Sequence, residues 1–150
     1  MAFNVKATLS SLTSKAKASG KFTGGVMIGE PKKPVDSYTI AFWMQSATVA
    51  QVTLGTTIEL HVVLARIHVL TLNDKSEDTE LETARLASTY TEDILGDFDL
   101  AATIRKVDAA GEYGTPMGVE WGHVDVGGLL ARVSDITIPL VVDDSATTTQ

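Results

Sequence analysis

His123 and Asp125 are the best candidates for a catalytic or metal-binding pair, and they lie in the segment E-W-G-H-V-D at positions 120–125. On a strand, side chains two positions apart point to the same face, so these two could hold one ion or form a His–Asp pair. The alternative is a polar strand face with Trp121 packed on the other side. We favour this structural interpretation.

A metal site needs more ligands than this pair supplies. A catalytic zinc takes three protein ligands, and the other histidines, His61 and His68, are seven positions apart and so on opposite faces of a strand. Because the chain has no cysteine, it offers no thiolate ligand, no Cys nucleophile and no disulfide. We therefore expect no metal and no cofactor.

The acidic segment from Gly96 to Asp99 is the next candidate, since with Asp93 it places three acids near one helix end. A calcium loop uses a longer pattern that ends in a carboxylate, which is missing here. The sequence contains no G-x-S-x-G elbow and no G-x-x-x-x-G-K-[ST] phosphate loop. The glycines of Val124–Gly128 lead from a strand into another strand, whereas a dinucleotide site leads into a helix. The sequence predicts that the protein is not an enzyme.

The run from Ile58 to Leu72 contains neither glycine nor proline. As one strand it would be roughly 50 Å long, at about 3.3 Å per residue, whereas a compact domain of this size is about 30 Å across. The odd positions from Val63 to Val69 are apolar, and only Arg66 and His68 break the apolar even face. This pattern predicts a strand that is buried on both sides and either bends or extends onto a neighbouring subunit.

The remaining elements follow from helical and strand periodicity and from Gly, Pro and polar turns. We expect an α+β fold in which two helices pack on a mostly antiparallel sheet with a long β-hairpin, forming one domain over residues 1–144 before a polar tail at 145–150. The predicted elements are helix Asn4–Ser19, strands Val26–Ile28, Ser37–Val52 and Ile58–Leu72, helix Glu77–Leu95 with the buried stripe Leu81, Ala84, Ala87, Tyr90 and Ile94, and strands Ala101–Asp108, Val119–Val126 and Leu129–Val142.

The net charge of −7 argues against a protein that wraps a phosphate backbone. Lysines gather in residues 6–33 and acids in residues 74–99, so a basic patch on one copy could meet an acidic patch on the next. Solvated charge on two helices explains the same asymmetry. Neither a secretion signal nor an apolar run long enough to span a membrane is present, so we expect a soluble protein made in a cytoplasm.

In element order and in several segments the chain resembles the tail terminator proteins of long, non-contractile-tailed bacteriophages, especially those that infect actinobacteria. The resemblance is one of pattern, covers nearly the whole chain and includes no motif as specific as a metal site. The segments that carry it are G-K-F (Gly20–Phe22), the Pro-containing loop Gly29–Pro34, A-F-W-M (Ala41–Met44), H-V-V-L-A-R-I-H (His61–His68), D-I-L-G-D-F-D-L (Asp93–Leu100) and the hairpin Gly118–Asp144.

The resemblance implies a structural role in the virion. Such proteins form a hexameric ring on the head-proximal end of the tail tube, stop its polymerisation and join it to the head connector. DNA would pass through the ring without specific binding, and the partners would be other copies, the tail tube protein and the connector. A tube subunit or a head–tail adaptor is the nearest alternative, and a small enzyme or ligand-binding domain is a more distant one. The candidate subunit-interface residues are Trp43, Leu64, Arg66, Ile67, His68 and Trp121.

Overall fold

The computed structural model describes residues 4–31, 38–70, 76–97, 100, 104–126 and 128–145. These residues form two helices and a curled, mostly antiparallel sheet of six strands, so the expected α+β fold is confirmed. The elements in chain order are α1 (Val5–Ser19), β1 (Gly25–Ile28), β2 (Thr39–Thr53), β3 (Thr56–Leu70), α2 (Ser76–Leu95), β4 (Lys106–Val107), β5 (Gly118–Val126) and β6 (Leu129–Ser145).

Local signals set both ends of α1. The side chain of Asn4 accepts a hydrogen bond from the backbone N–H of Ala7 at 3.0 Å, which caps the first turn. Gly20 ends the helix with a φ of 70°, a left-handed conformation that glycine adopts without a Cβ penalty. Thr8, Leu9, Leu12 and Ala16 are the buried residues of the helix, whereas Val5 at its start is exposed.

The buried face of α2 differs from the predicted one. Ala87, Tyr90 and Ile94 are buried as expected, but the side chain of Leu81 is 63% exposed and Ala84 is exposed. The helix instead buries Thr79, Thr83 and Leu86. Because successive residues are about 100° apart around a helix, Leu81 lies far from the line that joins these positions. Two threonines therefore occupy places that hydropathy alone would assign to leucine and alanine.

The sheet has the strand order β1-β2-β3-β6-β4. β5 also pairs with β6, on the same edge of β6 as the short β4. The two predicted hairpins, β2–β3 and β5–β6, are both present and antiparallel. β1 pairs in parallel with the start of β2, from Gly25 opposite Thr39 to Ile28 opposite Phe42. In the segment predicted as strand 101–108 the structure has only the short β4, and residues 101–103 lie outside the described part of the chain.

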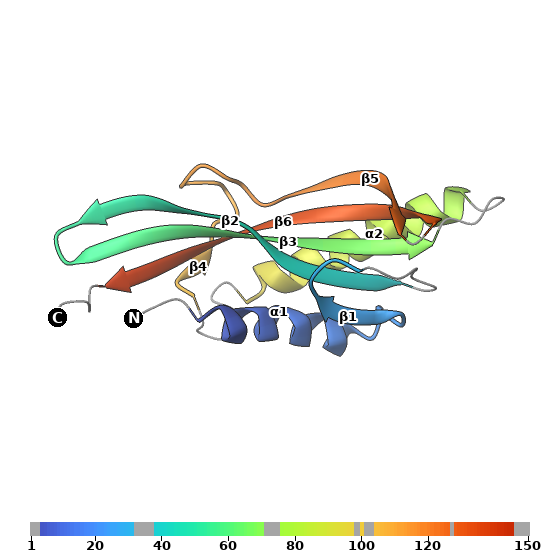
Figure 1. Ribbon diagram of the computed structural model, residues 1–150, viewed down its shortest axis with the longest axis horizontal. Helices are drawn as coiled ribbons and strands as arrows, with labels where there is room; N and C mark the ends of the chain where they lie inside the picture. The colour runs from blue at the N-terminus through green and yellow to red at the C-terminus, as the bar shows by residue number, and fades with distance from the viewer. Residues whose placement is uncertain are drawn as a thin grey trace.

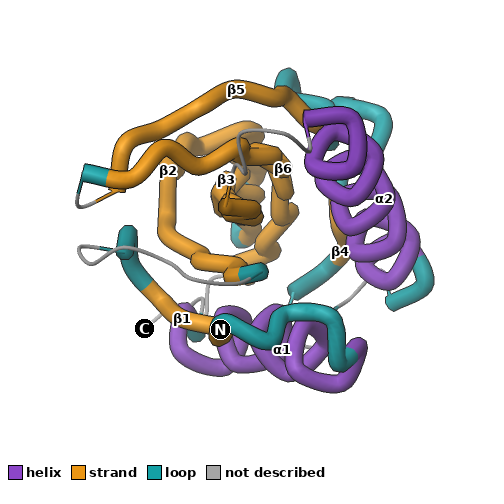
Figure 2. Tube along the Cα trace, turned by 90° about the vertical axis from the view of Figure 1, so that its right-hand side faces the viewer, coloured by secondary structure: helices purple, strands orange, loops and turns teal. Residues whose placement is uncertain are grey.

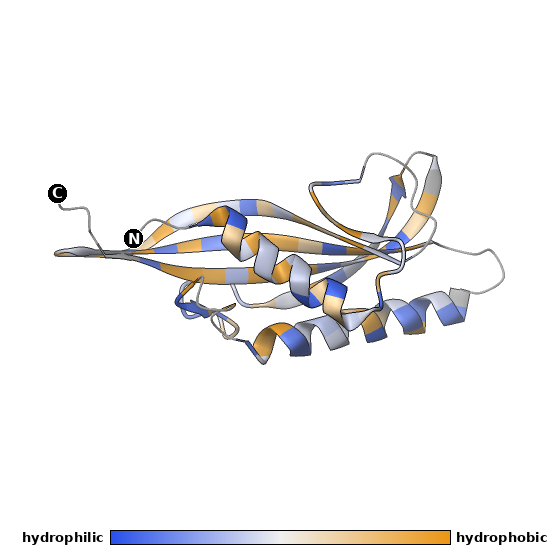
Figure 3. Ribbon diagram, turned by 90° about the horizontal axis from the view of Figure 1, so that it is seen from below, coloured by the Kyte–Doolittle hydropathy of each residue, from blue (hydrophilic) through white to orange (hydrophobic). Residues whose placement is uncertain are grey.

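Both helices lie on one face of the sheet, where the main hydrophobic core forms (Figures 1 and 3). Viewed along the long axis, the sheet curls so that β5 arches over the other strands (Figure 2). Odd-numbered residues of β3 such as Val63 and Ile67 point into the main core, and Leu60 and Val62 belong to a second cluster with Ile58 and Val141. The prediction that β3 is buried on both sides is therefore confirmed.

Candidate subunit interface

The end of the β2–β3 hairpin, together with the end of β6, extends past both helices (Figure 1). We call residues 45–58 the arm. Apolar side chains on it are open to solvent, with exposed fractions of 59% for Val49, 71% for Val52 and 105% for Leu54. β3 pairs with β6 along its whole length without a register shift, so it does not bend at a bulge but projects from the domain. Exposed apolar residues gathered at one end indicate a contact surface.

The arm has no charged side chain. The chain carries no Asp, Glu, Lys or Arg between Asp36 and Glu59. Natural sheets usually protect an exposed edge with charged residues or proline. The arm has neither charged residues nor proline, and this distinguishes it from an ordinary surface hairpin. Two register shifts in β2, between Met44 and Ser46 and between Val49 and Gln51, increase its twist. The uncharged run was visible in the sequence, but only the structure shows that it forms an exposed edge.

Trp43 and Arg66, two of the predicted interface residues, lie together near the base of the arm. The Arg66 guanidinium lies 5.3 Å from the centroid of the Trp43 ring, within the range of a cation–π contact. The same guanidinium binds Asp135 on β6 and lies 3.8 Å from Glu30. The cluster is partly exposed, so it can contact a second copy as well as tie three strands together.

Leu64, Ile67 and His68, the other predicted interface residues on β3, are buried within their own subunit. Their exposed fractions are 8%, 0% and 1%. The apolar pattern that suggested contact with a neighbour is explained by the core of the subunit itself. These three side chains are therefore not available to a second copy.

His68 is held neutral by its surroundings. Burial, and then the nearby charge of Arg66, lowers the pKa of His68 to about 4. Its Nδ1 atom makes no hydrogen bond within the described part of the chain. A protonated imidazole would bury an uncompensated charge here, so His68 serves as an uncharged core residue at neutral pH.

Trp121 lies on the same sheet face as His123 and Asp125, because all three are at odd positions of β5, so the prediction that it packs on the opposite face is wrong. Its side chain is 47% exposed. Leu130, on the same face of β6, is 52% exposed. Trp121 lies opposite Ser134 and Leu130 is near the start of β6, whereas the arm lies beside the far end of β6, where Ile58 is opposite Asp143.

His123 and Asp125 bind different partners. His123 Nδ1 is 3.4 Å from Arg132 Nη1, and Arg132 in turn pairs with Glu80 of α2 at 2.9 Å. Asp125 Oδ1 accepts a hydrogen bond from the backbone N–H of Gly128 at 2.8 Å and so caps the β5–β6 turn. Both side chains have structural contacts, and the geometry forms neither a His–Asp pair nor a metal centre. No group of three metal-binding side chains occurs among the described residues.

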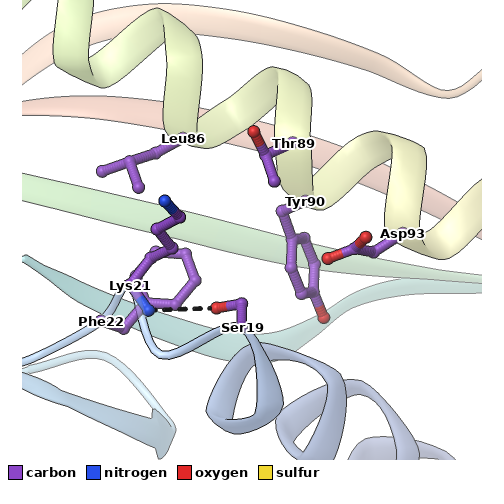
Figure 4. A pocket seen from close by; sticks show the side chains of 7 residues that line it. All are labelled: Ser19, Lys21, Phe22, Leu86, Thr89, Tyr90 and Asp93. Carbon is purple, nitrogen blue, oxygen red and sulfur yellow. Dashed lines mark hydrogen bonds between the residues drawn. The ribbon is translucent and has the colours of Figure 1, made fainter.

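A small hollow lies between the end of α1 and the middle of α2 (Figure 4). Phe22 and Tyr90 form its wall with their rings 6.3 Å apart, and the Lys21 backbone N–H donates to Ser19 Oγ at 3.3 Å. The hollow has no room for a molecule of water, and the depression of about 360 Å³ beside it is wide open. Neither feature has the enclosed shape of a small-molecule site.

A lysine of the basic first helix pairs with an aspartate at the end of the acidic second helix within one subunit. Lys15 Nζ lies 2.9 Å from Asp97 Oδ2, directly after α2. At least part of the predicted charge complementarity is thus used inside the subunit. Lys32 and Lys33, which belong to the same basic group, lie outside the described residues.

No protein-family profile matches this chain, and no curated protein matches it in sequence. Within the residues that the structure describes, neither helix is long and apolar enough to cross a membrane.

Proposed function

We propose that this chain is a virion structural protein, a tail terminator whose copies form a ring on the head-proximal end of a phage tail tube. The ring stops tube polymerisation and joins the tube to the head connector. The proposal rests on the segment resemblance described above and on one structural observation, the uncharged arm that leaves its own domain with Val49, Val52 and Leu54 exposed.

The arm supports assembly for an energetic reason. Burial of apolar surface away from water is favourable by about 25 cal/mol of free energy per Å². Burial of the three exposed apolar side chains of the arm against another subunit would therefore favour association. The arm lies beside the end of β6, whereas the exposed residues Trp121 and Leu130 lie on β5 and at the start of β6. Contact between two different surfaces is head-to-tail, and head-to-tail contacts generate rings when the rotation closes.

The charge is compatible with a channel for DNA. A chain with a net charge of −7 repels phosphates, so DNA could slide through a ring of such subunits without specific binding. The partners in this function are other copies of the chain, most simply six, the tail tube protein and the connector. The protein would be in the host cytoplasm during assembly and in the virion afterwards.

A tube subunit or a head–tail adaptor is the second candidate, because the same arm could drive open-ended stacking. The two functions differ in what purified protein does as its concentration rises. A terminator forms a ring of fixed mass, whereas a tube subunit continues to grow.

The first experiment is the mass of purified protein across concentration by light scattering, with negative-stain images of the same fractions. We expect rings of about six copies that do not lengthen. Val52→Asp on the arm should shift the mass to that of a monomer, while Leu81→Asp on the exposed side of α2 should leave the rings intact. A strict monomer at every concentration would contradict the proposal, and tubes of variable length would favour the tube subunit.

A further inference from the structure

The described sheet leaves two long strand edges without a neighbour. β1 covers the outer edge of β2 only as far as Phe42, so no described strand borders that edge along the arm. β5 pairs with β6 on one side and with no described strand on the other. Such edges present backbone N–H and C=O groups that a strand of another chain can pair with.

We propose that the arm edge of β2 pairs with the free edge of β5 in a second copy of the chain, joining the sheets of neighbouring subunits. This inference rests on the proposed ring and assigns the contact that closes it. The occupant is a second copy because the two free edges of one chain complement each other in direction, face and side chains.

The strand directions make the pairing antiparallel. β2 is antiparallel to β3, β3 to β6, and β6 to β5, so β5 runs opposite to β2. A second copy related by rotation about an axis that is tilted from the strands therefore brings an antiparallel β2 to β5, the more stable kind of ladder. The helix-bearing faces of the two copies then lie on the same side.

The faces of the two strands also agree. Ala47 and Val49 of the arm share the helix-bearing face, because they lie opposite His61 and Glu59 of β3. Trp121 and Val119 occupy that same face of β5. Pairing the edges would place these four side chains together, so the exposed valine of one copy would cover the exposed tryptophan of the next.

The two edges are displaced along the strand direction, since the arm lies opposite the first half of β3 and β5 lies level with the second half. In a closed ring whose strands are tilted from the ring axis, each subunit is shifted along the strand direction relative to its neighbour. With a tilt of about 35–45° and four strands about 4.8 Å apart, a neighbouring copy moves by about 13–19 Å, or about four to six residues. A displacement of that size toward β5 puts Ala47 opposite Val119 or Trp121.

Engineered disulfides test this contact, because the natural chain has no cysteine. We expect Ala47→Cys with Trp121→Cys, or Ala47→Cys with Val119→Cys, to form a ladder of covalent oligomers up to the ring on oxidation, reversed by reductant. Thr48→Cys with Trp121→Cys is the matched control. It should stay monomeric in a non-reducing gel, because Thr48 points to the other face.

A charge test complements the cross-links. Ala47→Lys should abolish the rings and leave the subunit folded by circular dichroism, since Ala47 is exposed, and Ala84→Lys on the exposed surface of α2 should preserve the rings. Suppose that the rings persist but that Ala47→Cys cross-links with neither Trp121→Cys nor Val119→Cys. That result would overturn the edge pairing and leave the ring proposal standing. Covalent dimers of the single variant Ala47→Cys would also overturn it, because β2 would then pair with itself. A parent protein that stays monomeric would refute both proposals.

Discussion

Arg66 and Asp135 are joined by two hydrogen bonds across the neighbouring strands β3 and β6, from Nε to Oδ1 at 2.6 Å and from Nη2 to Oδ2 at 2.9 Å. Both side chains are mostly shielded from water, with exposed fractions of 19% and 26%. The fork geometry fixes the guanidinium, which then lies over the ring of Trp43. The pair therefore organises the sheet face that is opposite the helices.

Removing one partner of this pair should cost more stability than removing both. Asp135→Ala leaves a half-buried guanidinium without its carboxylate and should lower the free energy of unfolding by roughly 2–3 kcal/mol. Arg66→Met with Asp135→Leu removes both charges and should cost less. Urea unfolding of the two variants checks this, and a double variant at least as unstable as Asp135→Ala would contradict it.

Tyr90 connects the two helices through a buried hydrogen bond. Its hydroxyl donates to the backbone oxygen of Leu12 at 2.8 Å, and burial raises the pKa of Tyr90 so that the proton stays in place. Tyr90→Phe should lower the free energy of unfolding by about 1 kcal/mol. Tyr113→Phe, at a partly exposed position, should change it by less than about 0.5 kcal/mol. Equal effects in thermal melts would show that the Tyr90 hydroxyl contributes nothing.

Leu86 and Leu81 of α2 should respond differently to truncation. Leu86 is 2% exposed and contributes to the main core, so Leu86→Ala should cost roughly 2–5 kcal/mol. Leu81 is 63% exposed, and Leu81→Ala should be nearly neutral in the isolated subunit. Chemical denaturation under conditions where the protein is monomeric measures both. A large loss for Leu81→Ala would mean that the helix is rotated from the orientation described above.

His68 should make stability depend on pH in mildly acidic solution. Its pKa is about 4 in the folded chain against an ordinary value of 6.5, so between these values the unfolded chain binds a proton that the folded chain does not. Stability should therefore fall as pH decreases from 6.5 to 4, by about 1.4 kcal/mol per pH unit from this group, and this contribution should level off below 4.

The control for this pH effect is His68→Gln, which keeps a polar side chain and cannot take up the proton. Groups that face His68, including Arg66, Asp135 and Thr39, are the same in both proteins. Urea unfolding at several pH values should give a steeper acid loss for the natural protein than for the variant. Parallel curves would exclude His68 as the source.

The order and type of most helices and strands could be predicted from the sequence, because the signals for them are local. Asn4 and Gly20 bound the first helix, and Gly55 and Gly128, both at positive φ, allow the two hairpin turns. Alternation along the strands likewise predicted a β3 that is buried on both sides. Each of these features depends on residues a few positions apart.

Which surfaces remain exposed to solvent depends on contacts between segments that are far apart in the chain. Hydropathy marks Ile67 as suited to any apolar environment, and it was the helices packed on one face of the sheet that buried it within the subunit. Similarly, Leu81 is exposed because the orientation of α2 is set by contacts with distant strands. The free edges of β2 and β5 follow from strand order, which joins segments far apart in the chain and leaves no local mark in the sequence.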